Sequence, residues 1–188
     1  MYNQRVNEHT PVSDRPWRRK DFALPRGVTV QEVRDAACGR SAKALLEQEL
    51  TSATGRIARQ CLACAYANVP DDVVILRWRK RLTGRALHKA DVAAIEAPLP
   101  KTRKALYVFL HECGHLHLHR KTSKSRHRRE FEAELYAHCR MQEAGIEVPE
   151  SMTENARRYI AWKIRQAVRR GARRLDQDAC DFARVSFP

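Results

Sequence analysis

The chain has 188 residues, of which 43% are hydrophobic, and its 36 Lys and Arg against 22 Asp and Glu give a net charge of +14. This length and hydrophobic content suffice for one domain with its own core and exclude a disordered chain. The sequence holds no apolar run of the about 20 residues that a membrane helix needs, and residues 1–20 lack an apolar signal-peptide segment. We therefore expect a cytoplasmic protein without a membrane partner, whose positive surface attracts polyanions such as nucleic acid.

The first part of the chain predicts an arm followed by helices. Residues 1–25 contain three prolines and several arginines, which indicates a flexible basic arm, and residues 26–188 are expected to form a single domain. A capping box at Thr29 predicts a helix that ends at Gly39. A longer helical stretch is expected from Ser41 to about residue 68, and Gly55 could divide it in two.

Short strands are predicted beyond Pro70, where β-branched and aromatic residues gather. The expected strands cover residues 73–78, 85–89 and 91–97. The fold class is therefore α+β: mostly helical, with a small antiparallel sheet of about three strands packed on the helix that follows.

Four helices are predicted after the sheet. The apolar period indicates helices over residues 102–119 and 128–144. Ser151 with Glu154 forms a capping box for a third helix ending at Gly171, and a short last helix starts at Asp176. Residues 151–188 thus make up a basic C-terminal helical region.

The cysteines are scattered rather than spaced as a disulfide framework, so we expect reduced thiols that are mostly buried. They are Cys38, Cys61, Cys64, Cys113, Cys139 and Cys180. The pair Cys61-x-x-Cys64 has no second pair with which to form a zinc ribbon, so core packing is the better interpretation.

His111 and His115 stand four residues apart in the segment His111-Glu112-Cys113-Gly114-His115. On a helix this spacing puts both imidazoles on one face, where they can share one zinc ion. Glu112 then lies beside the metal, where its carboxylate can accept a proton from a water that zinc activates. This H-E-x-x-H pattern is the signature of zinc metalloproteases. The alternative is two histidines on a solvated helix face.

A catalytic zinc site needs a third protein ligand, and the next helix offers Glu130, Glu132 and Glu134. Apolar neighbours predict that Glu132 points inward. Glu130 and Glu134 are expected to face solvent or to pair with nearby arginines.

The other histidines are weaker candidates for the metal. His119 shares a face with His111, but eight residues of helix separate the two by about 12 Å. Lys121 stands where the metzincin pattern requires a third histidine. We therefore expect His119, like His117 and His127, to lie in solvent. Tyr136 and His138 are candidates for a group that supports a ligand or stabilises an oxyanion, and the sequence does not choose between them.

The segment Leu110 to Leu116, followed by Glu130-x-Glu132-Ala133-x-x-Tyr136-Ala137, resembles the ImmA/IrrE-type metallopeptidases. This gluzincin-like family usually has H-E-L-G-H and then E-x-E-A-N-x-F-A, and the resemblance covers roughly residues 73–145. It implies one zinc ion per chain, Glu132 as the third ligand, and endopeptidase activity against a regulatory protein or repressor. The chain departs from the family at Glu134, where Asn or Asp is common, and at Cys139-Arg140-Met141, which replaces Leu-Leu-Met-Pro.

Residues 155–175 contain no acidic side chain. An apolar stripe of Ile160, Ile164, Ala167 and Val168 is expected to face the core and to turn the arginines outward. The candidates for nucleic-acid contact are Arg157, Arg158, Arg165, Arg169, Arg170, Arg173 and Arg174. Trp162 is expected in the core, although an aromatic ring beside arginines also suits stacking on bases.

Two functions are expected from these patterns together with what the resemblance implies. The first is a zinc endopeptidase with Glu112 as the catalytic base and His111, His115 and Glu132 as ligands. The second is a nucleic-acid-binding regulatory or antirestriction protein of a mobile element, whose zinc site is structural or vestigial. An intact Glu112 favours the enzyme, because a structural site needs no base, whereas the density of arginines favours the second.

Overall fold

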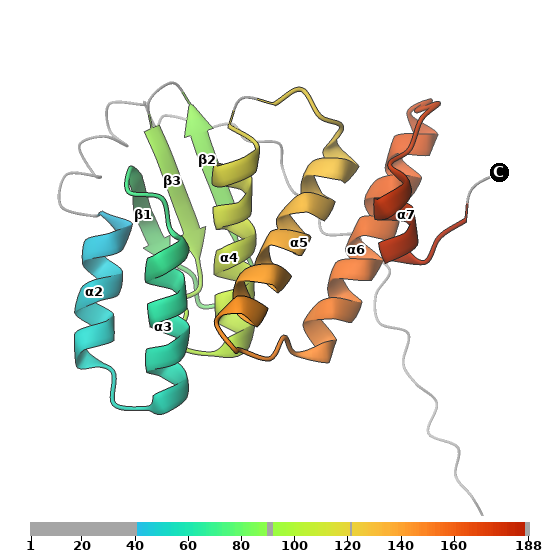
Figure 1. The fold of residues 1–188 in the computed structure, drawn as a ribbon. Helices are drawn as coiled ribbons and strands as arrows, with labels where there is room; N and C mark the ends of the chain where they lie inside the picture. Colours follow the sequence, from blue (N-terminus) through green and yellow to red (C-terminus); the bar gives the residue numbers. More distant parts are fainter. Residues whose placement is uncertain (1–40, 90–91, 121, 187–188) are drawn as a thin grey trace, which may run out of the picture.

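The computed structural model describes residues 41–89, 92–120 and 122–186. The arm predicted over residues 1–25 and the helix predicted over 29–39 lie outside this range. The described residues form six helices and one three-stranded sheet, which confirms the predicted α+β class (Figure 1). None of the described helices is long and apolar enough to cross a membrane.

The first two described helices form a hairpin. Helix α2 covers Ala42–Ser52 and α3 covers Arg56–Asn68, so the helical stretch is divided just before Gly55, as predicted. Leu46 and Leu62 are fully buried in the main core, and the thiols of Cys61 and Cys64 lie there as well. Burial raises the pKa of the Cys64 thiol to about 11, so this thiol stays protonated at neutral pH.

The sheet consists of β1 (Val73–Trp78), β2 (Arg85–Lys89) and β3 (Val92–Ala97), in the order β1-β3-β2. Strands β2 and β3 are antiparallel, but β1 runs parallel to β3, so the sheet is mixed rather than wholly antiparallel as predicted. Residues 93–97 are all buried, and a strand that is covered on both faces belongs in the centre of its sheet. Strand β1 therefore pairs with the edge of β3 that the β2–β3 hairpin leaves open.

Helix α4 (Arg103–Leu118) packs on β2 and β3 and is the central element of the fold. The Thr102 hydroxyl caps it by accepting a hydrogen bond from the Ala105 amide. Helix α5 (Arg126–Glu143) lies antiparallel beside α4 (Figure 1). Gly114 allows this close packing, since a Cβ atom there would come within 3.1 Å of the Cα atom of Ala133.

The last two helices extend the row beyond α5 and have a small core of their own. Helix α6 covers Glu150–Arg169 and α7 covers Gln177–Ala183, and Ile160, Ile164 and Cys180 pack between them. The predicted capping box at Ser151 is wrong, because α6 begins at Glu150 without a side-chain cap. The predicted start of α7 is confirmed, since the Asp176 carboxylate accepts a hydrogen bond from the Ala179 amide.

Candidate metal centre

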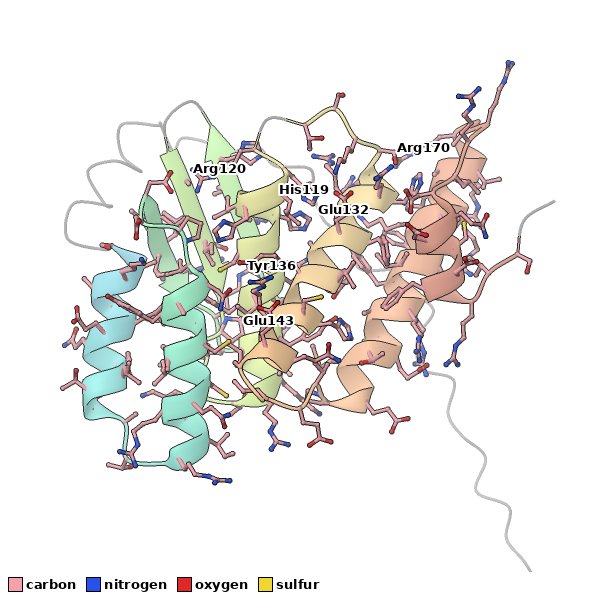
Figure 2. The ribbon with its side chains drawn as sticks, in the orientation of Figure 1. His119, Arg120, Glu132, Tyr136, Glu143 and Arg170 are labelled. Atoms are coloured by element: carbon pink, nitrogen blue, oxygen red, sulfur yellow. The ribbon has the colours of Figure 1, made fainter. Side chains whose placement is uncertain are left out.

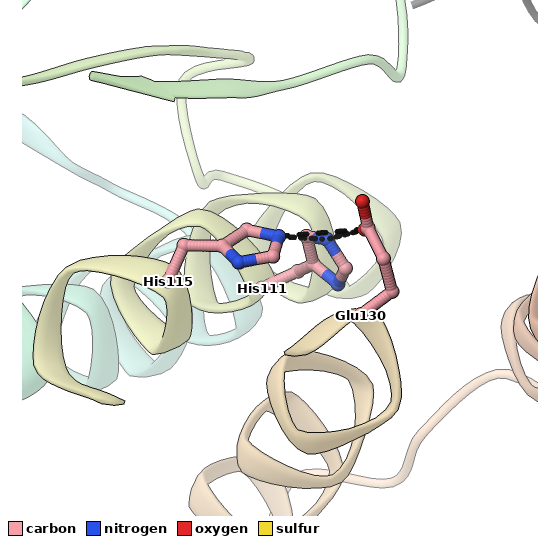
Figure 3. A group of neighbouring side chains, drawn as sticks. All are labelled: His111, His115 and Glu130. Atoms are coloured by element: carbon pink, nitrogen blue, oxygen red, sulfur yellow. Dashed lines mark hydrogen bonds and ion pairs between the residues drawn. The ribbon is translucent and has the colours of Figure 1, made fainter. Parts of the chain in front are cut away.

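His111, His115 and Glu130 form a group that could hold a metal ion (Figure 3). One ligand atom from each lies within 4.8 Å of the other two. The two Nε2 atoms are 3.1 Å apart, and Glu130 Oε2 lies 3.6 Å from Nε2 of His111 and 3.5 Å from Nε2 of His115. His111 and Glu130 are buried, and His115 is partly exposed.

The packing of α5 on α4 brings the glutamate to the histidines. The buried face of α5 carries Glu130, Ala133, Ala137 and Met141, spaced by three or four residues as one helix face requires. Ala133 packs against Gly114, and Gly114 directly precedes His115 in the sequence. Glu130 stands one turn earlier on the same face and therefore reaches the two imidazoles.

The structure brings Glu130, and not Glu132, to the two histidines. Glu130 and Glu134 are both buried, so neither faces solvent. The other expectation, a pairing with a nearby arginine, is confirmed for Glu130, whose Oε1 atom lies 3.9 Å from Arg126 Nε. Leu135, whose apolar side chain suggested the other face of the helix, is 46% exposed. The buried face of α5 thus contains two carboxylates in place of apolar residues, which is why hydrophobic periodicity selected the wrong glutamate.

Glu134 supports His111 from the side opposite the metal group. Its Oε1 atom lies 3.2 Å from His111 Nδ1, and its Oε2 atom accepts a hydrogen bond of 2.7 Å from the Tyr107 hydroxyl. Tyr107 in turn lies 3.1 Å from His138 Nδ1, and His138 Nε2 lies 3.0 Å from the Thr153 hydroxyl. Among the described residues, His138 is connected to the metal group through Tyr107 and through the Glu134 backbone oxygen, 2.9 Å from its Nδ1 atom. The approach of Glu134 to His111 is an ion pair by distance, since His111 Nδ1 makes no hydrogen bond of good geometry among the described residues, and the negative charge beside the second nitrogen of His111 favours its role as a ligand.

Glu132 supports His115 through a second histidine. His119 Nδ1 lies 3.3 Å from His115 Nδ1, and His119 Nε2 lies 2.8 Å from Glu132 Oε2. Figure 2 shows His119 and Glu132 facing each other between α4 and α5. The expectation that His119 is solvated is wrong, because its side chain is only 2% exposed. Lys124 and Arg128 also bind the carboxylate of Glu132, which keeps it away from the metal group.

Glu112 is buried beside the metal group and is 1% exposed. Its Oε1 atom has no hydrogen-bond partner among the described residues. Gly84, the residue before β2, lies against it, because a Cβ atom at position 84 would be 2.4 Å from Glu112 Oε1 and 2.5 Å from its Cγ atom. The missing side chain of Gly84 is therefore what leaves space for this carboxylate.

Other predicted residues lie away from the group. The Tyr136 hydroxyl points toward Asn68 of α3, at 3.4 Å from its side-chain oxygen. His117 is exposed, as predicted, whereas His127 is buried and accepts a hydrogen bond from the Asp176 amide, contrary to expectation.

The basic C-terminal region is partly as expected. Ile160 and Ile164 are buried, but Val168 is 41% exposed. Trp162 is half-buried and stacks on Tyr159 with ring centroids 6.0 Å apart. Arg157 pairs with Glu154.

The charges around the two histidines suit a cation. Glu112, Glu130 and Glu134 are three buried carboxylates around His111 and His115. Burial alone would lower the pKa of His111, but Glu134 and Glu130 outweigh it and raise that pKa well above the ordinary histidine value. Burial alone would raise the pKa of Glu134, yet His111 and Tyr107 hold it below its usual range. Two imidazoles and one carboxylate are a known donor set for catalytic zinc, so the residues fit this metal.

Zinc binding is expected to release a proton and to strengthen as the pH rises. The raised pKa of His111 means that its imidazole is protonated at neutral pH, while a metal ligand must be neutral. Below that pKa the affinity should increase about tenfold per pH unit for one displaced proton. Competition with a chromogenic chelator between pH 6.5 and 8.5 measures this slope. The variant His117→Gln, altered at an exposed histidine, should keep the same slope, and a pH-independent affinity would contradict the expectation.

Comparison of the chain with known protein families, with curated proteins and with solved structures found no match. What can be said of the site therefore comes from its own geometry: a buried His-His-Glu group on two packed helices, with the H-x-x-x-H spacing of an H-E-x-x-H motif and a further buried carboxylate beside it.

Proposed function

We propose that this protein is a zinc-dependent endopeptidase. The observation that carries the proposal is the gathering of His111, His115 and Glu130 in one buried group with Glu112 next to it. Three protein ligands leave a fourth zinc position open, which distinguishes a catalytic site from a closed structural one.

Glu112 supports catalysis rather than a purely structural metal. The Oε1 atom of Glu112 is buried without a hydrogen-bond partner among the described residues, which is costly, and a structural zinc site does not require such an atom. Such isolated groups are retained where chemistry uses them. Here the partner that the carboxylate lacks is the proton of an attacking water.

Each residue has a distinct part in the proposed reaction. His111, His115 and Glu130 would hold the zinc ion, which would supply Lewis acidity at the site. Glu112 takes a proton from the attacking water and passes it to the leaving amine. Glu134 pairs electrostatically with Nδ1 of His111, and His119 contacts Nδ1 of His115, while the two Nε2 atoms lie 3.1 Å apart.

The sheet supports a peptide as the substrate. Strand β2 is an edge of the described sheet, and it begins directly after Gly84, which touches Glu112. An extended peptide can add to such an edge through backbone hydrogen bonds. A peptide that pairs with the start of β2 would carry its backbone past the carboxylate of Glu112.

The resemblance to the ImmA/IrrE-type metallopeptidases agrees with this proposal and extends it to the substrate. We infer that the natural substrate is a regulatory protein or repressor rather than a nutrient protein. Glu130 replaces Glu132 in the ligand set that the resemblance implies, because Glu130 is the carboxylate beside the histidines.

The test is metal analysis combined with peptide cleavage. Purified protein should contain about one zinc ion per chain and should cleave members of a fluorogenic peptide library. A chelator should stop the cleavage, and added zinc should restore it. A protein that binds no zinc, or that binds zinc and cleaves neither the library nor an unfolded protein such as casein, would overturn the proposal.

Replacement of Gly84 by alanine is expected to lower peptide cleavage at least tenfold while zinc binding changes little. The three atoms nearest to the added Cβ atom all belong to Glu112, so the main effect of the substitution is to displace the base. Steady-state kinetics and zinc affinity of the variant measure the two effects. Gly55→Ala is the matched control, since a Cβ atom there meets nothing within 4 Å. Full activity in Gly84→Ala would contradict the close contact between residues 84 and 112.

We propose nucleic-acid binding as a second function, carried by α6 and the residues that follow it. Six arginines of this region are exposed, and no ion pair of theirs with a described acidic residue is observed; they are Arg158, Arg165, Arg169, Arg170, Arg173 and Arg174. Arg158, Trp162, Arg165 and Arg169 follow one helix face at intervals of three or four residues, and Figure 2 shows Arg170 at the far end of the helix. Arginines spaced by one turn beside an aromatic ring suit phosphates and bases.

Changing Arg165, Arg169 and Arg173 together to serine is expected to weaken DNA binding and to reduce its salt dependence. Each lost phosphate contact lowers the slope of log affinity against log salt by roughly one, so the slope should fall by roughly three. Fluorescence anisotropy with a labelled duplex at several salt concentrations measures it. The control triple of Arg56, Arg59 and Lys104 removes equal charge from exposed positions on α3 and α4. Equal losses in both triples would indicate attraction by net charge alone.

A further inference from the structure

Lys163 is a lysine buried inside the protein next to the metal group. It lies on α6 and is 3% exposed, and no other lysine or arginine among the described residues is classed as buried. An ammonium ion in the interior is unfavourable unless a carboxylate and further contacts compensate for the lost water. Its position therefore calls for a specific role.

The compensating carboxylate is that of Glu130. Lys163 Nζ donates a hydrogen bond of 3.2 Å to Glu130 Oε1, while Glu130 Oε2 faces His111 and His115. Arg126, one turn before Glu130 on α5, also lies on the Oε1 side, with its Nε atom 3.9 Å away. The two oxygens of this carboxylate thus have different neighbours, cations on one and imidazoles on the other.

The lysine is itself held in place by aromatic rings. Its Nζ atom lies 5.0 Å from the ring centroid of Tyr159 and 5.3 Å from that of Trp162, both within the range of cation–π attraction. Tyr159 and Trp162 stack on each other, which limits the movement of either ring. The ammonium group therefore has a defined position from which to orient the carboxylate.

Resting on the proposed zinc site, we propose that Lys163 is a positioning residue that holds Glu130 by its outer oxygen, so that Oε2 alone is presented to the metal. A carboxylate without this contact can rotate and offer either oxygen, or both, to the cation. Side chains that contact a metal ligand in this way contribute to metal affinity although they do not touch the metal themselves. Helix α6 is thereby joined to a site whose ligands all lie on α4 and α5.

The test compares Lys163→Met with Arg165→Met. Both variants remove one positive charge from α6, but only Lys163 contacts Glu130. Zinc affinity, measured by chelator competition, should fall about 10–100-fold in Lys163→Met and should stay unchanged in Arg165→Met. The visible absorption of bound Co²⁺ should also change at saturating metal in Lys163→Met, because the coordination by Glu130 is altered. A purely structural role of the lysine would lower the thermal stability without changing that spectrum.

A double-mutant cycle tests whether Lys163 acts through the glutamate. In a Glu130→Gln background, Lys163→Met should cause little further loss of zinc affinity. Unchanged or tighter zinc binding and an unchanged Co²⁺ spectrum in Lys163→Met would overturn the inference while leaving the zinc site in place. Absence of zinc from the unaltered protein would instead refute the proposed function.

A crystal structure of the zinc-loaded, unaltered protein decides the matter if Lys163→Met does not fold. Monodentate coordination through Glu130 Oε2, with Oε1 bound to Lys163, is the expected result. Bidentate coordination, or a lysine turned away from Glu130, would overturn the inference.

Discussion

Glu112→Gln is expected to retain one zinc ion per chain and to lose peptide cleavage by about 10²–10⁴-fold. General-base catalysis contributes rate enhancements of this size, and glutamine has the shape of glutamate without a basic oxygen. Zinc affinity should change little, since Glu112 is not among the three residues of the metal group. Zinc content and the cleavage rate of one fluorogenic peptide, measured on the same preparation, test the separation of the two effects.

The matched control is Glu143→Gln, which makes the same change at the exposed end of α5, away from the metal group (Figure 2). This variant should keep both zinc and activity. Cleavage by Glu112→Gln at the unaltered rate would remove Glu112 from the mechanism. Loss of zinc in that variant would show that the carboxylate supports the metal instead.

Glu130→Gln is expected to weaken zinc binding by more than about 100-fold, whereas Glu132→Gln should weaken it by no more than about tenfold. Glu130 faces both imidazoles, while Glu132 reaches His115 only through His119. Losing a group that contacts a ligand directly costs about 10–100-fold, and losing a ligand costs more; among the described histidines Glu132 contacts only His119, so its loss should fall below that range. The two variants remove equal charge two residues apart on one helix, so overall electrostatics do not explain a difference between them.

Zinc affinity by chelator competition and zinc content after dialysis measure this pair. The Gln side chain at position 130 can still accept a hydrogen bond from Lys163, which limits any loss of folding. If Glu132→Gln lost the metal and Glu130→Gln kept it, the ligand set implied by the family resemblance would hold instead. If both variants lost only a little zinc affinity, the third ligand would be a residue other than Glu130 or Glu132.

The secondary structure was largely readable from the sequence because local signals agree with the final fold. Strands β1 and β2 have the predicted bounds, and α4 starts directly after Thr102, where a hydroxyl caps it. The parallel pairing of β1 with β3 could not be predicted from the sequence. It joins segments about twenty residues apart, and it depends on β3 being buried on both faces. The order of the strands depends on which strand the helices cover. A local sequence pattern does not contain that information.

The choice among the three glutamates of α5 shows where sequence patterns fail. Hydrophobic periodicity assigns an inward face by its apolar residues, and Leu135 favoured the face of Glu132. The true inward face carries Glu130 and Glu134, whose burial is compensated by His111, Tyr107 and Lys163 from two other helices. The four-residue spacing of Ala133, Ala137 and Met141 was the available signal for this face, since small residues permit close helix packing.

His119 and Lys163 acquire their positions only in the folded chain. A distance of two helical turns correctly separates His119 from His111, but it does not exclude contact with His115, which is one turn away. Lys163 stands among arginines in a segment that reads as a solvated basic face. Its burial depends on where α6 crosses α5, and its role depends on which glutamate it meets there.

By itself, the sequence determined the helix and strand positions, the H-E-x-x-H pair of histidines and the basic character of the C-terminal region, since each depends on residues within a few positions of one another. The tertiary structure alone decided the mixed sheet, the carboxylate that joins the histidines and the groups that support it. Those outcomes depend on the packing of helices against each other, because a buried charge is tolerated only where distant residues supply its counter-charge and hydrogen bonds.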